Sequence, residues 1–557
     1  MRTTVELYEA FPREALQGVG VNVQLKGLVA LIDLFDRAGF DAIEVGWFQA
    51  ARIWTQLFEA IASGELPKPH HAKLFAFGST RRAKLTVESD TLFASMLTAP
   101  VDGITVFGKS WTDHVTDALR TTPENNLRMV HDSMAAISAA GKIGIFDAEH
   151  FFQGWLRDGG VYQLAVLDAA VAGGANTVAL CDTNGIAYPW QVFEVVSTVV
   201  ARFGDRVTVG VHMHDDRGQA VANSIEAVRA GARHVQGTTN GYSERVSMAC
   251  TLEVVANLQL LANEGYAWAQ INPDFNAEML TQLSREADRW AGLPIHLRKP
   301  FVGRYAAAHK AGVHGSAISR GGARLYESHN PEQFGRRRYV VVSSMAGRAN
   351  VVSFVNSTWN VVIDGNDGLV TRLLEEVERR ESQYGYCFDS ASGSAALLAA
   401  KILWPNAPTF EPLAEPSFSS SFPGARSGEL MATILMPDHR LASGSGDGPV
   451  DASFKALIGE LSREHSCLRQ LTLDTFRTFQ LRRFELEGTE SAMRVEIDWQ
   501  HELYGDFTTQ GVSGNLISAS FDAILEAVNL VLVYQWRAQQ TQNPIISEVF
   551  QTAQVAS

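Results

Sequence analysis

The chain has 557 residues, of which 46% are hydrophobic and 19% are charged, the balance of an ordinary soluble globular protein. This length exceeds what one hydrophobic core supports, so two or three domains are expected. The formal net charge of -14 argues against nucleic acid or an anionic membrane surface as the main partner.

The chain contains four cysteines, which are widely spaced and include no Cys-x-x-Cys pair. This pattern indicates free thiols in a reducing compartment. The N-terminal segment lacks the apolar core of a signal peptide, and no run approaches the length of a membrane-spanning segment. We therefore expect a cytoplasmic protein without a membrane partner.

Short β-rich runs alternate with longer helical patterns through the first half of the chain. The expected strands are Val5–Tyr8, Ala42–Trp47, Leu74–Gly78, Ile104–Gly108, Ile143–Asp147, Val178–Asp182, Val207–His212 and His234–Thr238. Most are separated by the length of a βα repeat. Eight parallel strands with helices outside them close a (β/α)8 TIM barrel, so an α/β fold of that kind is predicted.

Polar or glycine-rich residues follow nearly every one of these strands. Examples are Glu9–Gln17, Asp147–His150 and Asp182–Gly185. The carboxyl ends of all strands lie on one rim of a closed parallel barrel, where such folds carry their active sites. The repetition therefore predicts a site on that rim.

Two histidines follow the seventh strand at positions i and i+2. Side chains alternate across a strand, so His212 and His214 lie on the same face and can share one metal ion. The alternative is that each histidine ends the strand and hydrogen-bonds a neighbour. The turn Asp215–Gly218 and a helix beginning near Ala220 favour the metal site, because α/β enzymes build sites in this way.

The pattern changes near residue 275. Helical segments at Ala277–Trp290 and Leu369–Tyr384 surround a stretch bearing glycine and histidine, Ala308–Gly315, and Phe418–Gly428 is a linker or an irregular edge strand. The last part is an α+β unit with strand-like runs and helices at Leu430–Met436, Val450–Leu461, Leu471–Phe479, Met493–Trp499 and Ile517–Tyr534. We predict a barrel over 1–275, an accessory region over 276–405 and a C-terminal domain over 406–557.

Several of these segments resemble the acyl-CoA-condensing 2-isopropylmalate, homocitrate and citramalate synthases, with citramalate synthase most similar. The matching segments are Phe77–Arg82, Phe107–Trp111, Asp147–Phe152, His212–Ser224, Val235–Arg245, His309–Lys310, Tyr326–Glu327 and Gly511–Ile517. The resemblance implies metal-dependent condensation of acetyl-CoA, or a related acyl-CoA, with a short 2-oxo acid to give a 2-hydroxy-2-alkyl dicarboxylate. It also implies a C-terminal regulatory domain and a homodimer.

The family likeness carries residue roles with it. It implies that Glu14, His212 and His214 bind a divalent cation, and mixed oxygen and imidazole ligands suit Mg²⁺, Mn²⁺ or Zn²⁺. The remaining expected site residues are Arg13, Glu149, His309, His314 and Tyr326 for catalysis, and Gln17, Thr183 and Arg81 for substrate binding.

Two of these residues have simpler alternatives. Arg13 would stabilise charge on the ketone oxygen, or it is a structural partner of Glu9 or Glu44. Thr183 would bind the carboxylate of the oxo acid, or it caps the following helix.

The chain departs from the family pattern in two places. The family opens with Asp-Thr-Thr-Leu-Arg-Asp-Gly-x-Gln, whereas this chain reads Glu9–Gln17, so Glu14 replaces an aspartate and reaches one methylene further. Val246–Met248 replaces a Gly-Asn pair whose asparagine is a metal ligand. A fourth protein ligand is then missing, unless Asn240 or water takes its place.

Two other functions stay open at this point. Glu9, Pro12 and Leu16 are similar to the hydroxymethylglutaryl-CoA lyases, which cleave a carbon bond, although those enzymes lack a C-terminal unit. A non-catalytic metabolite sensor, whose altered first loop has lost turnover, is the third class.

Overall fold

The protein is described by a computed structural model that covers residues 4–336, 338–420, 430–481 and 491–541. The chain forms two compact units. The first consists of Met1–Ala307 with Asn330–Arg336, and the second of Ala308–His329 with Arg337–Ser557. Each unit has its own hydrophobic core, so each is described by itself.

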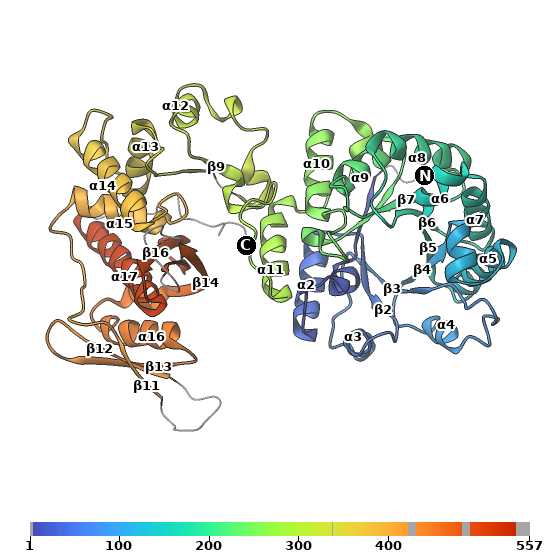
Figure 1. Ribbon diagram of the computed structural model, residues 1–557, viewed down its shortest axis with the longest axis horizontal. Helices are drawn as coiled ribbons and strands as arrows, with labels where there is room; N and C mark the ends of the chain where they lie inside the picture. Colours follow the sequence, from blue (N-terminus) through green and yellow to red (C-terminus); the bar gives the residue numbers. More distant parts are fainter. Residues whose placement is uncertain (1–3, 337, 421–429, 482–490, 542–557) are drawn as a thin grey trace. The chain divides into compact units, whose positions relative to one another are not determined.

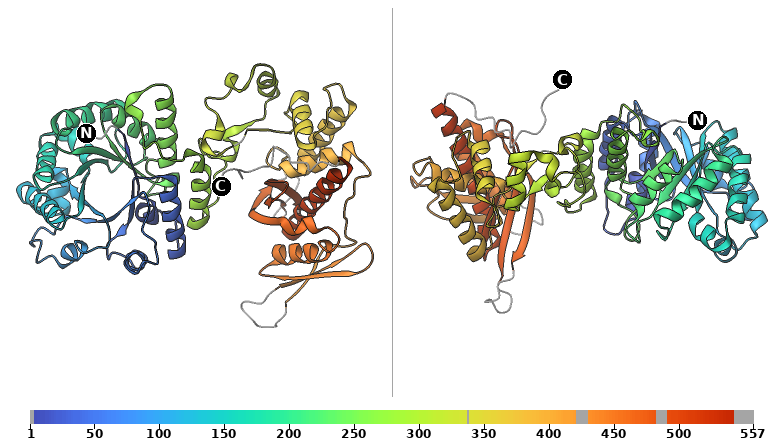
Figure 2. Two further views of the ribbon diagram at one scale, coloured as in Figure 1. Left: turned by 180° about the vertical axis from the view of Figure 1, so that it is seen from behind. Right: turned by 90° about the horizontal axis from the view of Figure 1, so that it is seen from above.

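The first unit is a closed barrel of eight parallel strands in sequential order, with helices outside it (Figures 1 and 2). The strands are β1 (Glu6–Glu9), β2 (Ala42–Trp47), β3 (Lys73–Ser79), β4 (Gly103–Lys109), β5 (Ile143–Glu149), β6 (Thr177–Asp182), β7 (Thr208–Met213) and β8 (His234–Gly237). All eight predicted strands and the TIM-barrel fold are confirmed.

Helices follow the strands, and most of them bury an apolar face against the outside of the barrel. They are α1 (Phe11–Glu14), α2 (Leu25–Ala38), α3 (Arg52–Ser63), α4 (Thr91–Met96), α5 (Pro123–Ala139), α6 (Phe151–Asp158), α7 (Val161–Ala172), α8 (Pro189–Phe203), α9 (Ala220–Arg229), α10 (Thr251–Asn263) and α11 (Leu280–Ala291). Helix α1 lies at the rim of the barrel, and the helix predicted near Ala220 is α9. Helix α11, predicted in the accessory region, packs against α2 in the first unit.

The second unit begins with the paired strands β9 (Ala308–His309) and β10 (Tyr339–Val340), followed by helical segments. The helices of this part are α12 (Gly312–Gly321), α13 (Arg348–Trp359), α14 (Gly368–Tyr384) and α15 (Ser392–Leu403). Helix α14 confirms the predicted helix at Leu369–Tyr384. Trp359 is completely buried in the core that these helices share with the C-terminal strands.

Two three-stranded antiparallel sheets, each followed by a helix, complete the second unit (Figure 1). Their elements are β11 (Ser417–Ser420), β12 (Leu430–Leu435), β13 (Leu441–Gly446) and α16 (Pro449–Leu461), then β14 (Leu471–Leu481), β15 (Ala492–His501), β16 (Phe507–Ser513) and α17 (Leu516–Thr541). The predicted α+β domain is therefore confirmed as a fold, and the sequence analysis missed β13 and β16.

The segment 418–428 and helix α17 bear on two expectations from the sequence. Within Phe418–Gly428, residues 418–420 belong to the edge strand β11, and 421–428 lie outside the described residues. Helix α17 is 26 residues long and apolar enough to cross a membrane, so the statement that no run approaches this length was wrong. Because 72% of its most apolar stretch is buried within the unit, the helix has the burial of a core helix.

Candidate active site

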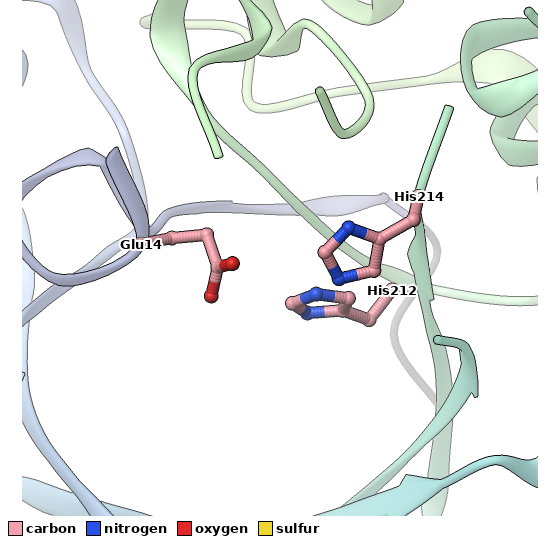
Figure 3. Close-up of side chains that lie close together, drawn as sticks. All are labelled: Glu14, His212 and His214. Atoms are coloured by element: carbon pink, nitrogen blue, oxygen red, sulfur yellow. The ribbon is translucent and has the colours of Figure 1, made fainter. Parts of the chain in front are cut away.

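Strand β7 and helix α1 bring three metal-ligating side chains together on the barrel rim. His212 and His214 project from the same side of the chain at the end of β7, and Glu14 is the last residue of the short helix after β1 (Figure 3). One ligand atom from each of the three lies within 4.8 Å of the others. All three residues are buried, with exposed fractions of 3% to 7%.

The electrostatics of this cluster suit a cation. Burial lowers the pKa of His212 to about 4 and the pKa of His214 well below its usual value, so both imidazoles are neutral at pH 7, as metal ligation requires. The Nδ1 atom of His214 is buried and has no hydrogen-bond partner among the described residues. A buried polar atom of this kind needs an explanation, and a bound divalent cation provides one. The residues therefore fit the metal that the family likeness implies.

A fourth protein ligand is not found at the two expected positions. The Asn240 amide donates to Asp288 Oδ1 (2.6 Å) and accepts from Ser284 Oγ (2.7 Å), so it is occupied elsewhere. Met248 is 2% exposed and pairs with the chain beside His214. The suggestion that Asn240 replaces the missing ligand was therefore wrong. Glu14, His212 and His214 would therefore be the protein ligands of a bound cation, with water or substrate as its other ligands.

Ser243 contacts the cluster and was not predicted from the sequence. Its hydroxyl donates to Glu14 Oε1 at 2.7 Å. This hydrogen bond orients the longer carboxylate that replaces the family's aspartate. Because Ser243 follows β8 and Glu14 follows β1, only closure of the barrel brings the two together.

Arg13 lies beside Glu14 and is held on several sides. Its Nε donates to Glu44 Oε1 at 2.5 Å, its guanidinium also pairs with Glu14, and the group lies 3.8 Å from the centre of the Phe77 ring. The side-chain oxygen Oε1 of Gln17 lies 3.5 Å from Arg13 Nη1. Of the two structural partners considered from the sequence, Glu44 is the one observed.

Glu149 and Thr183 lie on neighbouring strands of the same rim. Glu149 ends β5 and forms an ion pair with Lys109, which ends β4. The Thr183 hydroxyl accepts a hydrogen bond from the backbone N–H of His150 at 2.8 Å. This contact differs from the helix cap considered above, since the following helix begins at Pro189. The hydroxyl proton of Thr183 remains available for a ligand.

Arg81 has a different environment from the rest of the predicted set. Its guanidinium binds Asp132 on α5 at 2.7 Å and donates to the Leu85 carbonyl at 2.9 Å. These contacts fix the loop after β3. A substrate role for Arg81 stays a prediction.

Gln236 and Lys109 were missed as contacts of the predicted site residues. Gln236 lies on β8, 2.7 Å from His212 Nδ1, and the sequence carried a signal for it. His234 and Gln236 are polar residues at positions i and i+2 of a buried strand, the same pattern that identified the histidine pair on β7.

The matches to known proteins cover nearly the whole chain. The HMGL-like family matches residues 4–286, the homocitrate synthase post-HMGL domain-like family residues 301–367, and the LeuA allosteric (dimerisation) domain residues 428–532. The chain is 34% identical to an (R)-citramalate synthase of Aquifex aeolicus, over 95% of this chain and 98% of that protein. The chain belongs to the citramalate synthase family.

Other members of the citramalate synthase family and its relatives give the same picture. An (R)-citramalate synthase of Streptomyces coelicolor is 35% identical, over 95% of this chain and 97% of that protein. A 2-isopropylmalate synthase of Aliivibrio salmonicida is 25% identical, over 98% of this chain and 99% of that protein. These full-length matches include the second unit.

Three predicted catalytic residues of this family member lie in the second unit. The Nε2 atom of His309 is 3.3 Å from Glu327 Oε1, and Arg338 pairs with Glu327. The His314 ring stacks on Tyr326 with a centroid distance of 4.1 Å. His309, His314 and Tyr326 are thus near one another within their own unit, with centroids of His309 and His314 6.2 Å apart.

Proposed function

We propose that this enzyme joins the acetyl group of acetyl-CoA to a short 2-oxo acid, as a citramalate synthase does, and so acts as an acyltransferase. The observation that supports this function most directly is the buried cluster of Glu14, His212 and His214 beside Arg13. The full-length identity to (R)-citramalate synthases supports the same reaction. A divalent cation, Mg²⁺, Mn²⁺ or Zn²⁺, held by the cluster would polarise the ketone as a Lewis acid.

The residues of the chain have separate tasks in this reaction. The Arg13 guanidinium stabilises the negative charge that develops on the ketone oxygen, because it is already fixed by Glu44. Thr183 donates its hydroxyl proton to the carboxylate of the oxo acid, with Gln17 and Arg81 as further substrate-binding residues. His309, with His314 and Tyr326 of the same unit, removes a proton from the methyl group of acetyl-CoA. Glu149 of the first unit is a further catalytic residue. Water then hydrolyses the thioester of the condensed product and releases CoA.

The regulatory and cellular assignments are part of the same proposal. Residues 428–532 match a dimerisation domain, which supports a homodimer with feedback control in the C-terminal region. All four cysteines are free thiols, which supports a cytoplasmic location. Sedimentation equilibrium tests the dimer: a mass of one chain at micromolar concentration would contradict it.

A thiol-release assay with acetyl-CoA and a panel of 2-oxo acids tests the reaction. We expect CoA release with at least one short oxo acid when Mg²⁺, Mn²⁺ or Zn²⁺ is present, and loss of that release in His212→Ala. His70→Ala is the matched control. His70 is exposed and precedes β3, so it lies at the amino-terminal end of the barrel strands, opposite the rim that carries His212. Its replacement should leave the rate unchanged. No release with any oxo acid and metal would overturn the proposal.

The two alternative functions give different results in the same preparation. A lyase would produce acetyl-CoA from a 3-hydroxyacyl-CoA without an oxo acid. A sensor would bind metal and oxo acid without releasing CoA. The dimerisation domain and the full-length match to synthases favour condensation over both.

A further inference from the structure

Gln236 connects the metal-ligand cluster to a buried carboxyl group inside the barrel. Its Oε1 atom lies 2.7 Å from His212 Nδ1, and its Nε2 atom donates to Asp147 Oδ1 at 2.9 Å. The side chain is completely buried, and Asp147 is 3% exposed. Both ends of the amide are therefore used, on two different strands.

The direction of these two hydrogen bonds determines which nitrogen of His212 carries the proton. A glutamine amide has one acceptor oxygen and one donor nitrogen. The nitrogen donates to Asp147, so the oxygen faces His212, and Nδ1 of that ring must be the donor. A neutral imidazole protonated on Nδ1 has its lone pair on Nε2. The free Nε2 is then the atom available to a cation shared with Glu14 and His214.

We propose that Gln236 is a positioning residue that holds His212 in the metal-binding tautomer and so sets the affinity of the site for its cation. This inference rests on the proposed metal site. Metal-ligating histidines typically donate their other N–H to a carboxylate, a carbonyl or water, and loss of that partner weakens metal binding. Gln236 supplies this partner through a neutral amide.

The neighbouring charges explain why an amide rather than a carboxylate holds this position. Glu44 and Asp147 are both buried within the barrel, and the Glu44 charge acts on Asp147. A carboxylate at position 236 would be a third buried acid in a medium that screens charge poorly, and its charge would be costly even with Asp147 protonated. The amide keeps the acceptor for His212 and uses its donor on Asp147, so no buried polar atom of Gln236 is left without a partner.

The second histidine of the cluster has no side-chain partner equivalent to Gln236 among the described residues. Its Nδ1 lacks a hydrogen-bond partner among the described residues. The pair is therefore asymmetric: a side-chain amide fixes the tautomer of His212, and no side chain among the described residues does so at Nδ1 of His214. Gln236 is for this reason a position outside the three ligands at which metal affinity should depend on the side chain.

Direct metal binding tests the inference without measuring turnover. The variant is Gln236→Met, which keeps the volume and loses the acceptor, and the probe is Mn²⁺ added to metal-free protein and followed by calorimetry. Gln163→Met is the matched control, because Gln163 is also completely buried in the first unit but donates to the Ser110 carbonyl. We expect Mn²⁺ affinity to fall by about 10- to 100-fold in Gln236→Met and to be unchanged in Gln163→Met. Spectra of ¹⁵N-labelled histidine should show that His212 loses its single tautomer only in Gln236→Met.

The possible results separate this inference from the proposed function. If wild type binds Mn²⁺ no better than His212→Ala, the metal site itself is wrong. If wild type binds Mn²⁺ and Gln236→Met binds it equally well with the same His212 tautomer, the role of Gln236 is wrong. If Gln236→Met does not fold, Gln236→Asn replaces it, because its amide is one methylene too short to contact both partners. Weaker Mn²⁺ binding by Gln236→Asn supports the role, and wild-type affinity overturns it.

Discussion

Arg13 illustrates how buried groups prepare the site before a substrate arrives. Its guanidinium is fixed by Glu44, and Glu44 accepts a hydrogen bond of 2.8 Å from the Tyr8 hydroxyl. The register between β2 and β3 shifts immediately after Glu44, a bulge that re-aims the side chains around it. The positive charge is therefore held beside Glu14 by completely buried residues, which is the fixed arrangement that makes electrostatic stabilisation effective.

Replacing Arg13 by lysine should expose this dependence. Lysine keeps the charge but cannot bind Glu44 and stack on Phe77 together, since it lacks the planar fork. We expect kcat in the thiol-release assay to fall by about 100- to 1,000-fold. Arg37→Lys is the control, because Arg37 is exposed on α2 and forms an exposed ion pair with Asp33. A kcat for Arg13→Lys within a few fold of wild type would contradict the assignment.

Asp147 should make the stability of the barrel depend on pH. Burial, reinforced by the charge of Glu44, raises the pKa of Asp147 to about 8, far above its value of about 4 in an unfolded chain. As the pH rises from about 4 to 8, the unfolded chain releases a proton that the folded chain keeps. The contribution of this group to the free energy of unfolding therefore falls, by at most about 1.4 kcal/mol per pH unit.

Asp147→Asn removes this titration and keeps an oxygen that accepts from Gln236. The free energy of unfolding of the variant, relative to wild type, should increase steadily between pH 5 and pH 8. Urea unfolding at several pH values measures the difference, in which the titrating groups remote from Asp147 cancel. A difference that does not change with pH would show that Asp147 is ionised in the folded protein.

At the level of elements, the repeating part of the fold was readable from the sequence and the irregular part was not. The eight barrel strands were predicted because β-branched runs recur at the spacing of βα units. Strand β13 was missed because Leu441–Gly446 is rich in glycine and serine, which is typical of a turn. In the folded protein, glycine at position 444 allows close packing of the strand on a helix. A Cβ on Gly444 would lie 2.3 Å from the backbone nitrogen of Ala456 on α16.

Some residues of the candidate site were likewise readable from the sequence, and others were not. The histidine pair was predicted because strand periodicity alone fixes its geometry. Ser243 and Lys109 were not predicted, because they meet Glu14 and Glu149 only through closure of the barrel and pairing of adjacent strands. A sequence without an alignment does not reveal contacts of that kind.

Gly511 tests the close packing of a helix on a strand in the second unit. A Cβ at this position of β16 would lie 2.0 Å from the backbone oxygen of Ala519 on α17, so the helix must shift in Gly511→Ala. We expect the free energy of unfolding to fall by about 1–3 kcal/mol. Gly459→Ala is the control, because Gly459 lies on α16 with nothing within 4 Å of its Cβ, and alanine there should raise stability by up to about 1 kcal/mol. Urea unfolding followed by circular dichroism measures both, and equal stability of Gly511→Ala and wild type would contradict the packing argument.

At the level of the whole molecule, the expected base His309 belongs to the same unit as the dimerisation domain. His309 ends the two-residue strand β9, and the next residue, Lys310, forms an ion pair of 2.6 Å with Asp389. The segment carrying Asp389 is bound to β16, since the backbone N–H of Cys387 donates to Gln510 at 2.8 Å. The second unit therefore has a continuous set of contacts from the sheet of β14, β15 and β16 to the residue beside His309.

Lys310→Met should test whether these contacts position His309. The substitution keeps the length of the side chain and removes the charge, so the segment after β9 loses its link to Asp389. Lys310 is half-exposed, and for such a pair the loss of stability should stay below about 1 kcal/mol. A small displacement of a catalytic group has a much larger effect on the rate than on stability. We expect kcat to fall between about 3- and 100-fold, and the affinity for Mn²⁺ to be unchanged.

Lys455→Met is the matched control, because Lys455 is also about half-exposed and forms an ion pair of 2.7 Å with Asp451 in the same unit. If both variants keep the wild-type kcat, the ion pair does not position His309, and if both lose it equally, the effect is one of charge rather than of position.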